Sequence, residues 1–250
     1  MKLPPNVIDE EELREKRFIF RDREEAGVRL ARKLSILSKK VDLVYAIPRG
    51  GVPIGIEVAK TLATKLDLLI CRKLVFPFNR EAGFGAIDPE GGIYLNLELV
   101  EYFQLSNSII EISKTDAIKE LMRLNKLLRR GKKYNKLTGS VIIVDDGIAS
   151  GYTMMSAVRF VKKKGAKEVI VASPTASLAA IRLLSTIADL IVILNVRSGP
   201  VYAVADAYVN WYDLRDSDVL EYLKKNRHLL LFKVNYYPRR GREESDYFYI

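Results

Sequence analysis

The sequence predicts an α/β fold, in which a doubly wound and mainly parallel sheet carries helices on both faces. Two observations predict this class. Short apolar runs, typical of strands buried on both faces, alternate with segments of helical apolar spacing. Polar motifs mark the ends of three of these runs, and in such sheets ligands bind at the carboxyl ends of the strands. The expected strands cover residues 41–47, 68–74, 141–144, 168–172 and 190–194.

Composition narrows the class of protein. The chain has 250 residues, 48% of them hydrophobic, which is enough to bury a core as one domain with an appendage or as two small lobes. It lacks an apolar run of about 18 residues and a signal-peptide core, so we expect a cytoplasmic protein with no membrane partner. A single cysteine, Cys71, excludes an internal disulfide, and a single histidine, His228, argues against His-based metal sites and triads. The 29% charged residues and the scarcity of thermolabile residues fit a thermophile.

The chain is strongly basic, with a net charge of +10. Such a charge attracts a polyanionic ligand such as a pyrophosphate ester, but it attracts nucleic acid as well. Seven basic residues and no acid lie between Arg123 and Lys136, near the end of a helix expected over 109–130. Three interpretations of this cluster are open: it binds nucleic acid, it attracts an anionic substrate, or it complements the negative end of the helix dipole on a solvated face. We favour the last interpretation slightly.

The first part of the chain contains one expected helix and one polar loop. Residues 8–36 have helical spacing with an expected break near Arg21. The strand over 41–47 ends in Pro48-Arg49-Gly50-Gly51, where adjacent glycines allow close backbone approach and Arg49 carries a permanently charged, planar fork. The loop is therefore interpreted as an anion site, with a plain glycine turn into the next helix as the alternative.

The strand over 68–74 carries two cations, Arg72 and Lys73. Cations at the end of a buried strand are costly unless an anion compensates them. Lys73 is therefore the best single candidate for stabilising an anionic leaving group, although it can also simply reach solvent. Cys71, beside them, is expected to be a small core residue rather than a nucleophile.

The most informative stretch runs from Val141 to Met154. Four β-branched residues lead into Asp145 and Asp146, and a loop of small and hydroxylated residues then leads into a helix that begins near Gly151. Free amides at a helix N-terminus attract phosphate. Adjacent carboxylates suit a vicinal diol or a hard cation such as Mg²⁺. A phosphorylated sugar would satisfy both parts of the motif.

The chain divides into an α/β domain over 1–222 and a basic, tyrosine-rich C-terminal extension over 223–250. Within the domain, residues 76–104 are rich in Gly, Pro and Phe and are expected to form a lid or a hairpin that turns at Gly91-Gly92. Residues 196–218 are a possible hood.

Trp211 and Tyr212 lie in this possible hood. They either stack on a planar base or fill the core as aromatic plugs. The two interpretations are equally well supported by the sequence.

Three of these motifs resemble known ones. The stretch from Val141 to Thr153 resembles the phosphoribosyl pyrophosphate motif of the type I phosphoribosyltransferases, and Ala46 to Val52 resembles their pyrophosphate loop. Arg72-Lys73 is similar to the Arg-Lys pair that contacts pyrophosphate in the orotate and adenine enzymes. The resemblance covers roughly residues 18–222 and is nearest to the predicted microbial phosphoribosyltransferases, whose substrate is not settled.

The resemblance implies roles for individual residues. Asp145 and Asp146 would hold the ribose hydroxyls and Mg²⁺, while Arg49 and Lys73 would stabilise departing pyrophosphate. A strained or cis peptide is expected near Arg49-Gly50. The implied substrate-binding residues are Gly50, Gly51, Arg72, Gly147, Ile148, Ala149, Ser150, Gly151, Tyr152, Thr153, Trp211 and Tyr212.

The implied activity is Mg²⁺-dependent transfer of ribose 5-phosphate from phosphoribosyl pyrophosphate to a nitrogen of a nucleobase-like acceptor, as in nucleotide salvage, by a homodimer. Ala149 departs from the 6-oxopurine enzymes, which have an aspartate there, so the loop is closer to the adenine and orotate types. Two alternatives stay open: a non-catalytic regulator that senses phosphoribosyl pyrophosphate and binds nucleic acid, and a hydrolase without an acceptor base.

Overall fold

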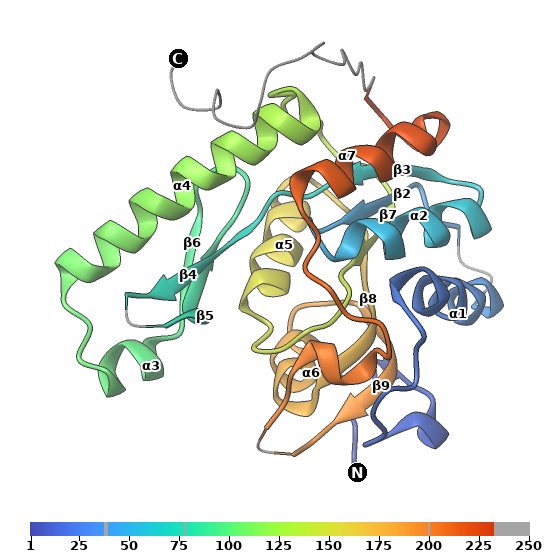
Figure 1. Cartoon of the computed structure of the whole chain (residues 1–250), viewed down its shortest axis with the longest axis horizontal. Coiled ribbons are helices and arrows are strands. Elements are labelled where there is room, and N and C mark those ends of the chain that lie inside the picture. Colours follow the sequence, from blue (N-terminus) through green and yellow to red (C-terminus); the bar gives the residue numbers. More distant parts are fainter. Residues whose placement is uncertain (38–39, 78, 200, 233–250) are drawn as a thin grey trace.

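A six-stranded sheet forms the centre of the molecule in the computed structural model, which describes residues 1–37, 40–77, 79–199 and 201–232 (Figure 1). Its strand order is β1-β9-β8-β7-β2-β3, and all its pairings are parallel. This arrangement confirms the predicted class. The strands are β1 (Val7–Ile8), β2 (Leu43–Ala46), β3 (Lys65–Leu68), β7 (Ser140–Val144), β8 (Glu168–Ser177) and β9 (Leu190–Arg197).

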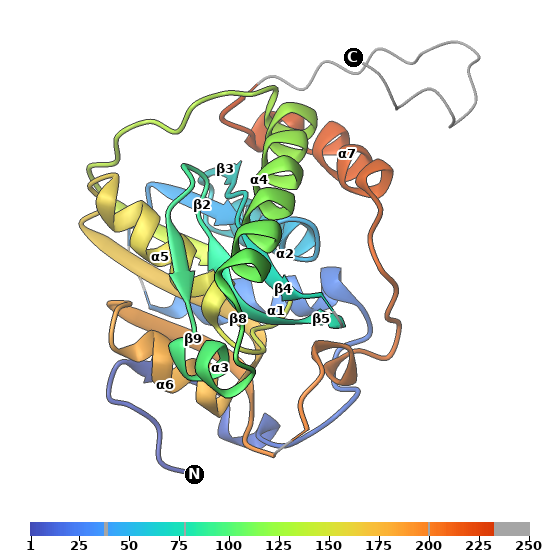
Figure 2. The same ribbon diagram turned by 90° about the vertical axis from the view of Figure 1, so that its left-hand side faces the viewer.

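A second, antiparallel sheet stands beside the first, backed by a long helix (Figure 2). It contains β4 (Arg72–Phe76), β5 (Asn79–Ile87) and β6 (Ile93–Leu95), followed by α3 (Leu97–Tyr102) and α4 (Asn107–Arg129). The chain reverses between β5 and β6 through Gly91, whose φ of +90° favours glycine. The predicted hairpin turn at Gly91-Gly92 is thereby confirmed.

The expected single strand over 68–74 is wrong. β3 ends at Leu68, and Arg72 begins a strand of the other sheet. The hydroxyl of Tyr134 explains the break, because it accepts a hydrogen bond from the Ile70 amide at 3.0 Å and donates one to the Leu68 carbonyl at 3.1 Å. These bonds replace the strand ladder where the chain leaves the parallel sheet.

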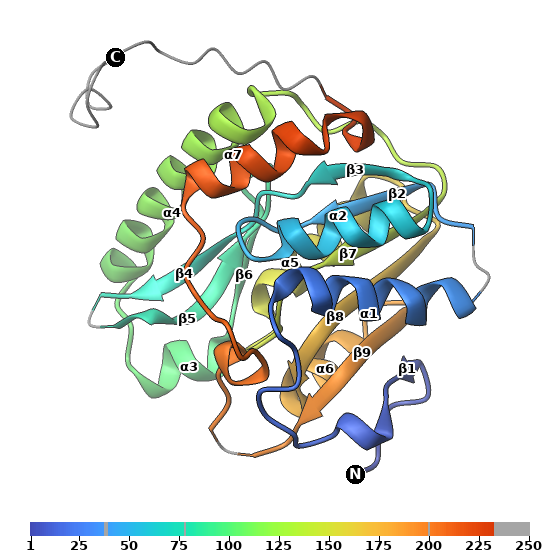
Figure 3. The ribbon, with the colours of Figure 1, turned by 45° about the vertical axis from the view of Figure 1, so that its right-hand side comes forward.

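Helices cover both faces of the parallel sheet, as predicted (Figure 3). Alternate strand residues point to opposite faces, so Val44 packs in the core under α1 and α2 whereas Tyr45 packs in the core under α5. Helix α7 packs against α2. The bounds are α1 (Arg23–Ile36), α2 (Gly51–Thr61), α5 (Tyr152–Lys163), α6 (Leu178–Ser185) and α7 (Asp216–Lys225).

The helix expected over 8–36 begins only at Arg23. Asp22 caps it by accepting a hydrogen bond from the Glu25 amide at 2.8 Å. The preceding apolar residues are extended instead, because Phe20 is fully buried and bridges to Tyr208. Upstream of these residues, β1 joins the edge of the sheet and Glu11–Leu13 form a short 3₁₀ helix, η1.

The start of the predicted C-terminal extension packs on the domain. The amide of Leu231 donates a hydrogen bond to the Leu66 carbonyl at 3.1 Å, and Leu229 and Leu230 are buried. Residues 233–250, the rest of that predicted extension, lie outside the described residues. In the part of the chain that the structure describes, every helix is too short or too polar to cross a bilayer.

Candidate active site

Two loops meet at the carboxyl ends of β2 and β7. The strands pair in register, Ala46 with Val144, so the loop Pro48–Gly51 (the Arg-Gly-Gly loop) starts level with Asp145 and Asp146 (the acid pair). A side chain at Gly50 would overlap the carboxylate of Asp146. Glycine at position 50 is therefore required by the close approach of the two loops. The Pro48-Arg49 peptide is cis, one residue before the position expected from the sequence.

The acid pair is held by a buried arginine from α1. Arg23 donates from Nε to Asp146 Oδ2 at 2.8 Å, and its exposed fraction is 6%. The Tyr208 hydroxyl donates to the backbone carbonyl of Asp146 at 2.6 Å, and Asp145 Oδ1 accepts the Asp146 amide at 2.9 Å. Burial, and next the negative charge of Asp146, raise the pKa of Asp145 well above its ordinary value. Arg23 is therefore one cation beside two carboxylates, so the acid pair can still bind hydroxyl donors or a further cation.

Trp211 and Tyr212 contact Arg23, the arginine that binds Asp146. The guanidinium of Arg23 lies 3.9 Å from the centre of the Trp211 ring, and its Nη1 donates to the Tyr212 carbonyl at 2.8 Å. Trp211 also packs on Tyr208. One use of Trp211 is therefore to hold Arg23 in place, and the predicted stacking of a base on it stays a prediction. The Tyr212 side chain is exposed.

The loop after the acid pair covers residues 147–153 (the small-residue loop). Backbone hydrogen bonds hold its Ile148, whereas no side chain caps the helix at its end. Ile148 exchanges backbone hydrogen bonds with the end of β8, where its amide donates to the Thr175 carbonyl and its carbonyl accepts the Ser177 amide, both at 3.0 Å. Gly151 has a φ of +84° and begins α5 without any side-chain cap. The first amides of α5 are thus left for another acceptor. Ala149 and Ser150 are exposed, and Tyr152 and Thr153 are half-buried.

Two of the predicted cations, Arg49 and Arg72, lie in a group of charges from four parts of the chain. Arg49 Nε donates to Asp216 Oδ1 at 2.8 Å, and Arg123 Nη1 donates to Asp216 Oδ2 at 2.7 Å. Glu120 completes the group, 3.8 Å from Arg49 and 2.7 Å from Arg123. Burial, more than any of these neighbouring charges, lowers the pKa of Arg72. These five residues form the charge cluster.

Asp216 is the main partner of Arg49 in the charge cluster. Although burial alone would raise the pKa of Asp216, hydrogen bonds from Arg123 and Arg49 hold it below its ordinary value. Asp216 is therefore an anion bound to the guanidinium of Arg49, which the sequence predicts to bind pyrophosphate.

Lys73 occupies a different position from Arg72. It pairs with Ala86 of β5, and its side-chain stem passes close to the Cα of Gly83. Successive strand residues leave a sheet on opposite faces, so Arg72 and Lys73 point in opposite directions from β4.

Sequence reasoning missed Arg23, Glu120, Arg123 and Asp216 as parts of the site. Arg23 lies 123 positions from Asp146 in the sequence, and Arg49 lies 167 positions from Asp216. Glu120, Arg123 and Asp216 have no local pattern that distinguishes them from solvated helix charges. The cap residue Asp22 was the one local signal, because it fixes where α1 starts and hence that Arg23 occupies its first turn.

Comparison with known proteins agrees with this geometry. A family model described as a phosphoribosyl transferase domain matches residues 92–187, which include the acid pair and α5. Two Mycobacterium tuberculosis proteins, named "Putative phosphoribosyl transferase MT0597" (strain CDC 1551 / Oshkosh) and "Putative phosphoribosyl transferase Rv0571c" (strain ATCC 25618 / H37Rv), are each 36% identical to the chain over 208 residues. The match covers 83% of this chain and 47% of each relative, so the chain spans about half the length of these curated relatives.

A solved structure extends the comparison to the whole fold. The crystal structure of the protein TT1426 from Thermus thermophilus is 33% identical, with a TM-score of 0.66, and the match covers 82% of this chain and 98% of that one. The acid pair, the Arg-Gly-Gly loop and the parallel sheet are thus accompanied by similarity in sequence and in fold. The chain belongs to the type I phosphoribosyltransferase family.

Proposed function

We propose that the protein transfers the ribose 5-phosphate group of phosphoribosyl pyrophosphate to a nitrogen of a nucleobase-like acceptor and releases pyrophosphate. The observation that carries this proposal is the contact between Gly50 and the carboxylate of Asp146. It brings a pair of carboxylates, suited to a sugar diol, against a loop with a permanent cation, suited to pyrophosphate.

The 5-phosphate would bind at the start of α5. The first amides of that helix have no side-chain cap, and a helix N-terminus carries roughly half a positive charge. The hydroxyls of Ser150 and Thr153 are close in sequence to these amides and can add donors. The ribose hydroxyls would then donate to the acid pair.

The acid pair also fits Mg²⁺. Asp145 accepts the Asp146 amide and Asp146 accepts from Arg23, and the two carboxylates lie close to each other at the end of β7. No group of three or more acidic, His or Cys side chains that could hold a metal occurs among the described residues. Mg²⁺ commonly binds through one or two carboxylates together with substrate phosphates and water, which matches this donor set. When bound, the ion would offset the charge of the pyrophosphate.

Departure of pyrophosphate would be stabilised by cations on the Arg-Gly-Gly-loop side of the contact between Gly50 and Asp146. Arg49 and Arg72 lie in the charge cluster and would supply these cations, whereas Lys73, which was expected to do so, leaves β4 on the opposite face. Asp216 accepts a hydrogen bond from Arg49, so pyrophosphate would replace this carboxylate on the guanidinium. Fixed charges of this kind stabilise a developing anion without reorganisation of water.

The alternative of a nucleic-acid-binding regulator has less support. Of the basic residues between 123 and 136, Arg123 pairs with Glu120 and Asp216, and Arg129 is buried against Asp67. These two cations are compensated within the protein. The remaining exposed charges are what nucleic acid would have to use.

An assay of pyrophosphate release tests the transferase. The protein is incubated with phosphoribosyl pyrophosphate, Mg²⁺ and each common nucleobase in turn, and we expect release with one base or one class of base. Asp145→Asn plus Asp146→Asn should abolish it. Glu111→Gln plus Asp116→Asn is the matched control, since it removes the same charge from two exposed acids of α4. Equal rates in both double variants would contradict the proposal, and release without any base would favour the hydrolase.

A further inference from the structure

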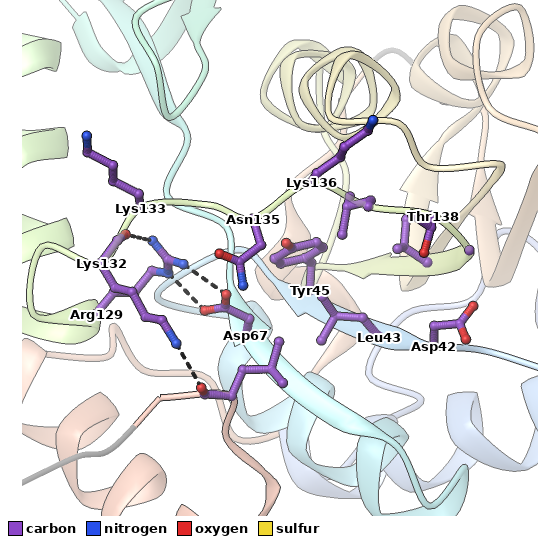
Figure 4. Close-up of a pocket in the computed structure, with 14 residues that line it drawn as sticks. Asp42, Leu43, Tyr45, Asp67, Arg129, Lys132, Lys133, Asn135, Lys136 and Thr138 are labelled. Carbon is purple, nitrogen blue, oxygen red and sulfur yellow. Dashed lines mark hydrogen bonds and ion pairs between the residues drawn. The ribbon is translucent and has the colours of Figure 1, made fainter.

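A pocket opens at the opposite end of the parallel strands from the acid pair (Figure 4). It has a volume of about 220 Å³ and lies between β2, β3 and the segment that connects α4 to β7. Asp42 and Gly139, which line it, precede β2 and β7, whereas the candidate active-site loops follow these strands. The pocket is thus distinct from the candidate active site.

The floor of the pocket contains an unused hydrogen-bond donor. Tyr45 is 2% exposed and lines the pocket, and its hydroxyl has no hydrogen-bond partner among the described residues. Burial raises the pKa of Tyr45, so the hydroxyl stays protonated and can donate. An acceptor atom of a ligand in the pocket could therefore take the hydrogen bond of this hydroxyl. Figure 4 shows the Tyr45 ring beside Asn135, which offers an amide to the same space.

The acidic residues around the pocket are already engaged. Asp67 accepts two hydrogen bonds from Arg129, at 2.8 and 2.9 Å, and Arg129 Nη1 donates to the Lys132 carbonyl at 2.6 Å. Asp42 accepts the Ser140 amide at 2.8 Å. These contacts make a rigid wall whose carboxylates are paired or hydrogen-bonded, so their repulsion of an anion is reduced.

Three lysines, Lys132, Lys133 and Lys136, form the rim. Lys132 donates to the Leu231 carbonyl at 3.1 Å, while Lys133 and Lys136 extend outward in Figure 4. Both outward side chains are long and exposed, and rotation about their side-chain bonds can bring the ammonium groups over the pocket mouth. The result is a cationic rim above a polar, partly enclosed floor.

We propose that this pocket binds a small phosphate monoester, with the phosphate between Lys133 and Lys136 and the polar body of the ligand against Tyr45 and Asn135. The enclosed floor favours a small molecule over nucleic acid, whose phosphates would need only the rim. The inference is independent of the reaction proposed for the acid pair, because no residue is shared between the two sites.

Amide NMR resolves the two sites in one titration. Ribose 5-phosphate should shift the signals of residues 132–139 in a saturable way, separately from those of the small-residue loop. Lys133→Ala plus Lys136→Ala should weaken binding at 132–139 about 10-fold or more, and Tyr45→Phe about 5-fold, because hydrogen bonds to a bound ligand are lost. Neither change should alter the affinity at residues 147–153.

Lys2→Ala plus Lys119→Ala is the charge-matched control, because both lysines are exposed and outside the pocket. Thermal unfolding of each variant checks that the fold is retained. Equal weakening by the control, or no shift of residues 132–139 with ribose 5-phosphate or AMP, would overturn the proposal. So would inorganic phosphate binding as tightly as the esters, or a shift that only a single-stranded oligonucleotide produces.

Discussion

The parallel sheet carries two buried arginine–aspartate pairs, one on its edge strand β3 and one just after β7, and the two pairs are built differently. Arg129 meets Asp67 through two hydrogen bonds, and its remaining nitrogen donates to a carbonyl. Arg23 meets Asp146 through one, while Asp145 stands beside them. Arg129 balances the charge of Asp67. Arg23 balances only one of the two carboxylates of the acid pair. Uncompensated charge, rather than buried charge itself, therefore marks the place at which a further cation or hydroxyl donors are expected.

The balanced pair should matter most for stability. Arg129→Met keeps much of the side-chain volume but leaves the buried carboxylate of Asp67 alone, which should lower the free energy of unfolding by about 3–5 kcal/mol. Urea denaturation measures the change. Asp67→Asn in the same background should restore part of the loss, and a loss below about 1 kcal/mol would mean that the pair is not structural.

The unbalanced pair should matter less for stability and more for binding. Arg23→Met removes the cation facing Asp146, but the acid pair can respond by holding a proton, so we expect a loss of about 1–3 kcal/mol. The same change removes the partner of the Trp211 ring and should shift the tryptophan fluorescence. If Arg23→Met costs as much stability as Arg129→Met, the contrast between the two pairs fails.

The carboxylate of Asp216, which is bound to Arg49, should compete with pyrophosphate for this guanidinium. Asp216→Asn frees that guanidinium, and we expect pyrophosphate to bind a few-fold more tightly, with a stability loss under about 1 kcal/mol because the pair is partly exposed. Asp218→Asn is the control, since Asp218 lies on the same helix and pairs with Arg215 instead. Calorimetry with pyrophosphate gives both affinities, and unchanged or weaker binding in Asp216→Asn would show that Asp216 does not compete.

The smallest effect should be a pH dependence of stability. The pKa of Asp145 is raised in the folded protein, so the folded state holds a proton that the unfolded state has already lost. Stability should therefore fall as the pH rises from the ordinary aspartate pKa to the raised one, and then level off. Asp145→Asn should remove this slope when both proteins are unfolded with denaturant across that range without Mg²⁺. Parallel pH profiles for the two proteins would contradict the assignment.

The sheet and its loops were predictable because their signals are local. The four residues before Asp145 carry their own strand preference, and Gly50 and Gly51 mark a close backbone approach without reference to any partner. The composition of that stretch thus predicted both the element and the loop that follows.

The parts that failed depend on distant partners. A tyrosine hydroxyl, that of Tyr134, ends β3 and sends Arg72 to another sheet. Phe20 is extended rather than helical because Tyr208, far along the chain, pairs with it. The charge cluster needs Asp216 from α7, which no spacing in the sequence relates to Arg49. Tertiary packing overrode local preference at each of these positions.

The acid pair and the Arg-Gly-Gly loop are proposed to form one site for phosphoribosyl pyrophosphate. Calorimetric titration with that compound, with and without Mg²⁺, tests it most directly. We expect one binding event at this site that is tighter with Mg²⁺ and is lost in Asp145→Asn plus Asp146→Asn. Gly50→Ala should weaken it, because the added methyl group would displace the Asp146 carboxylate. Binding that is indifferent to Mg²⁺ and to both changes would contradict it.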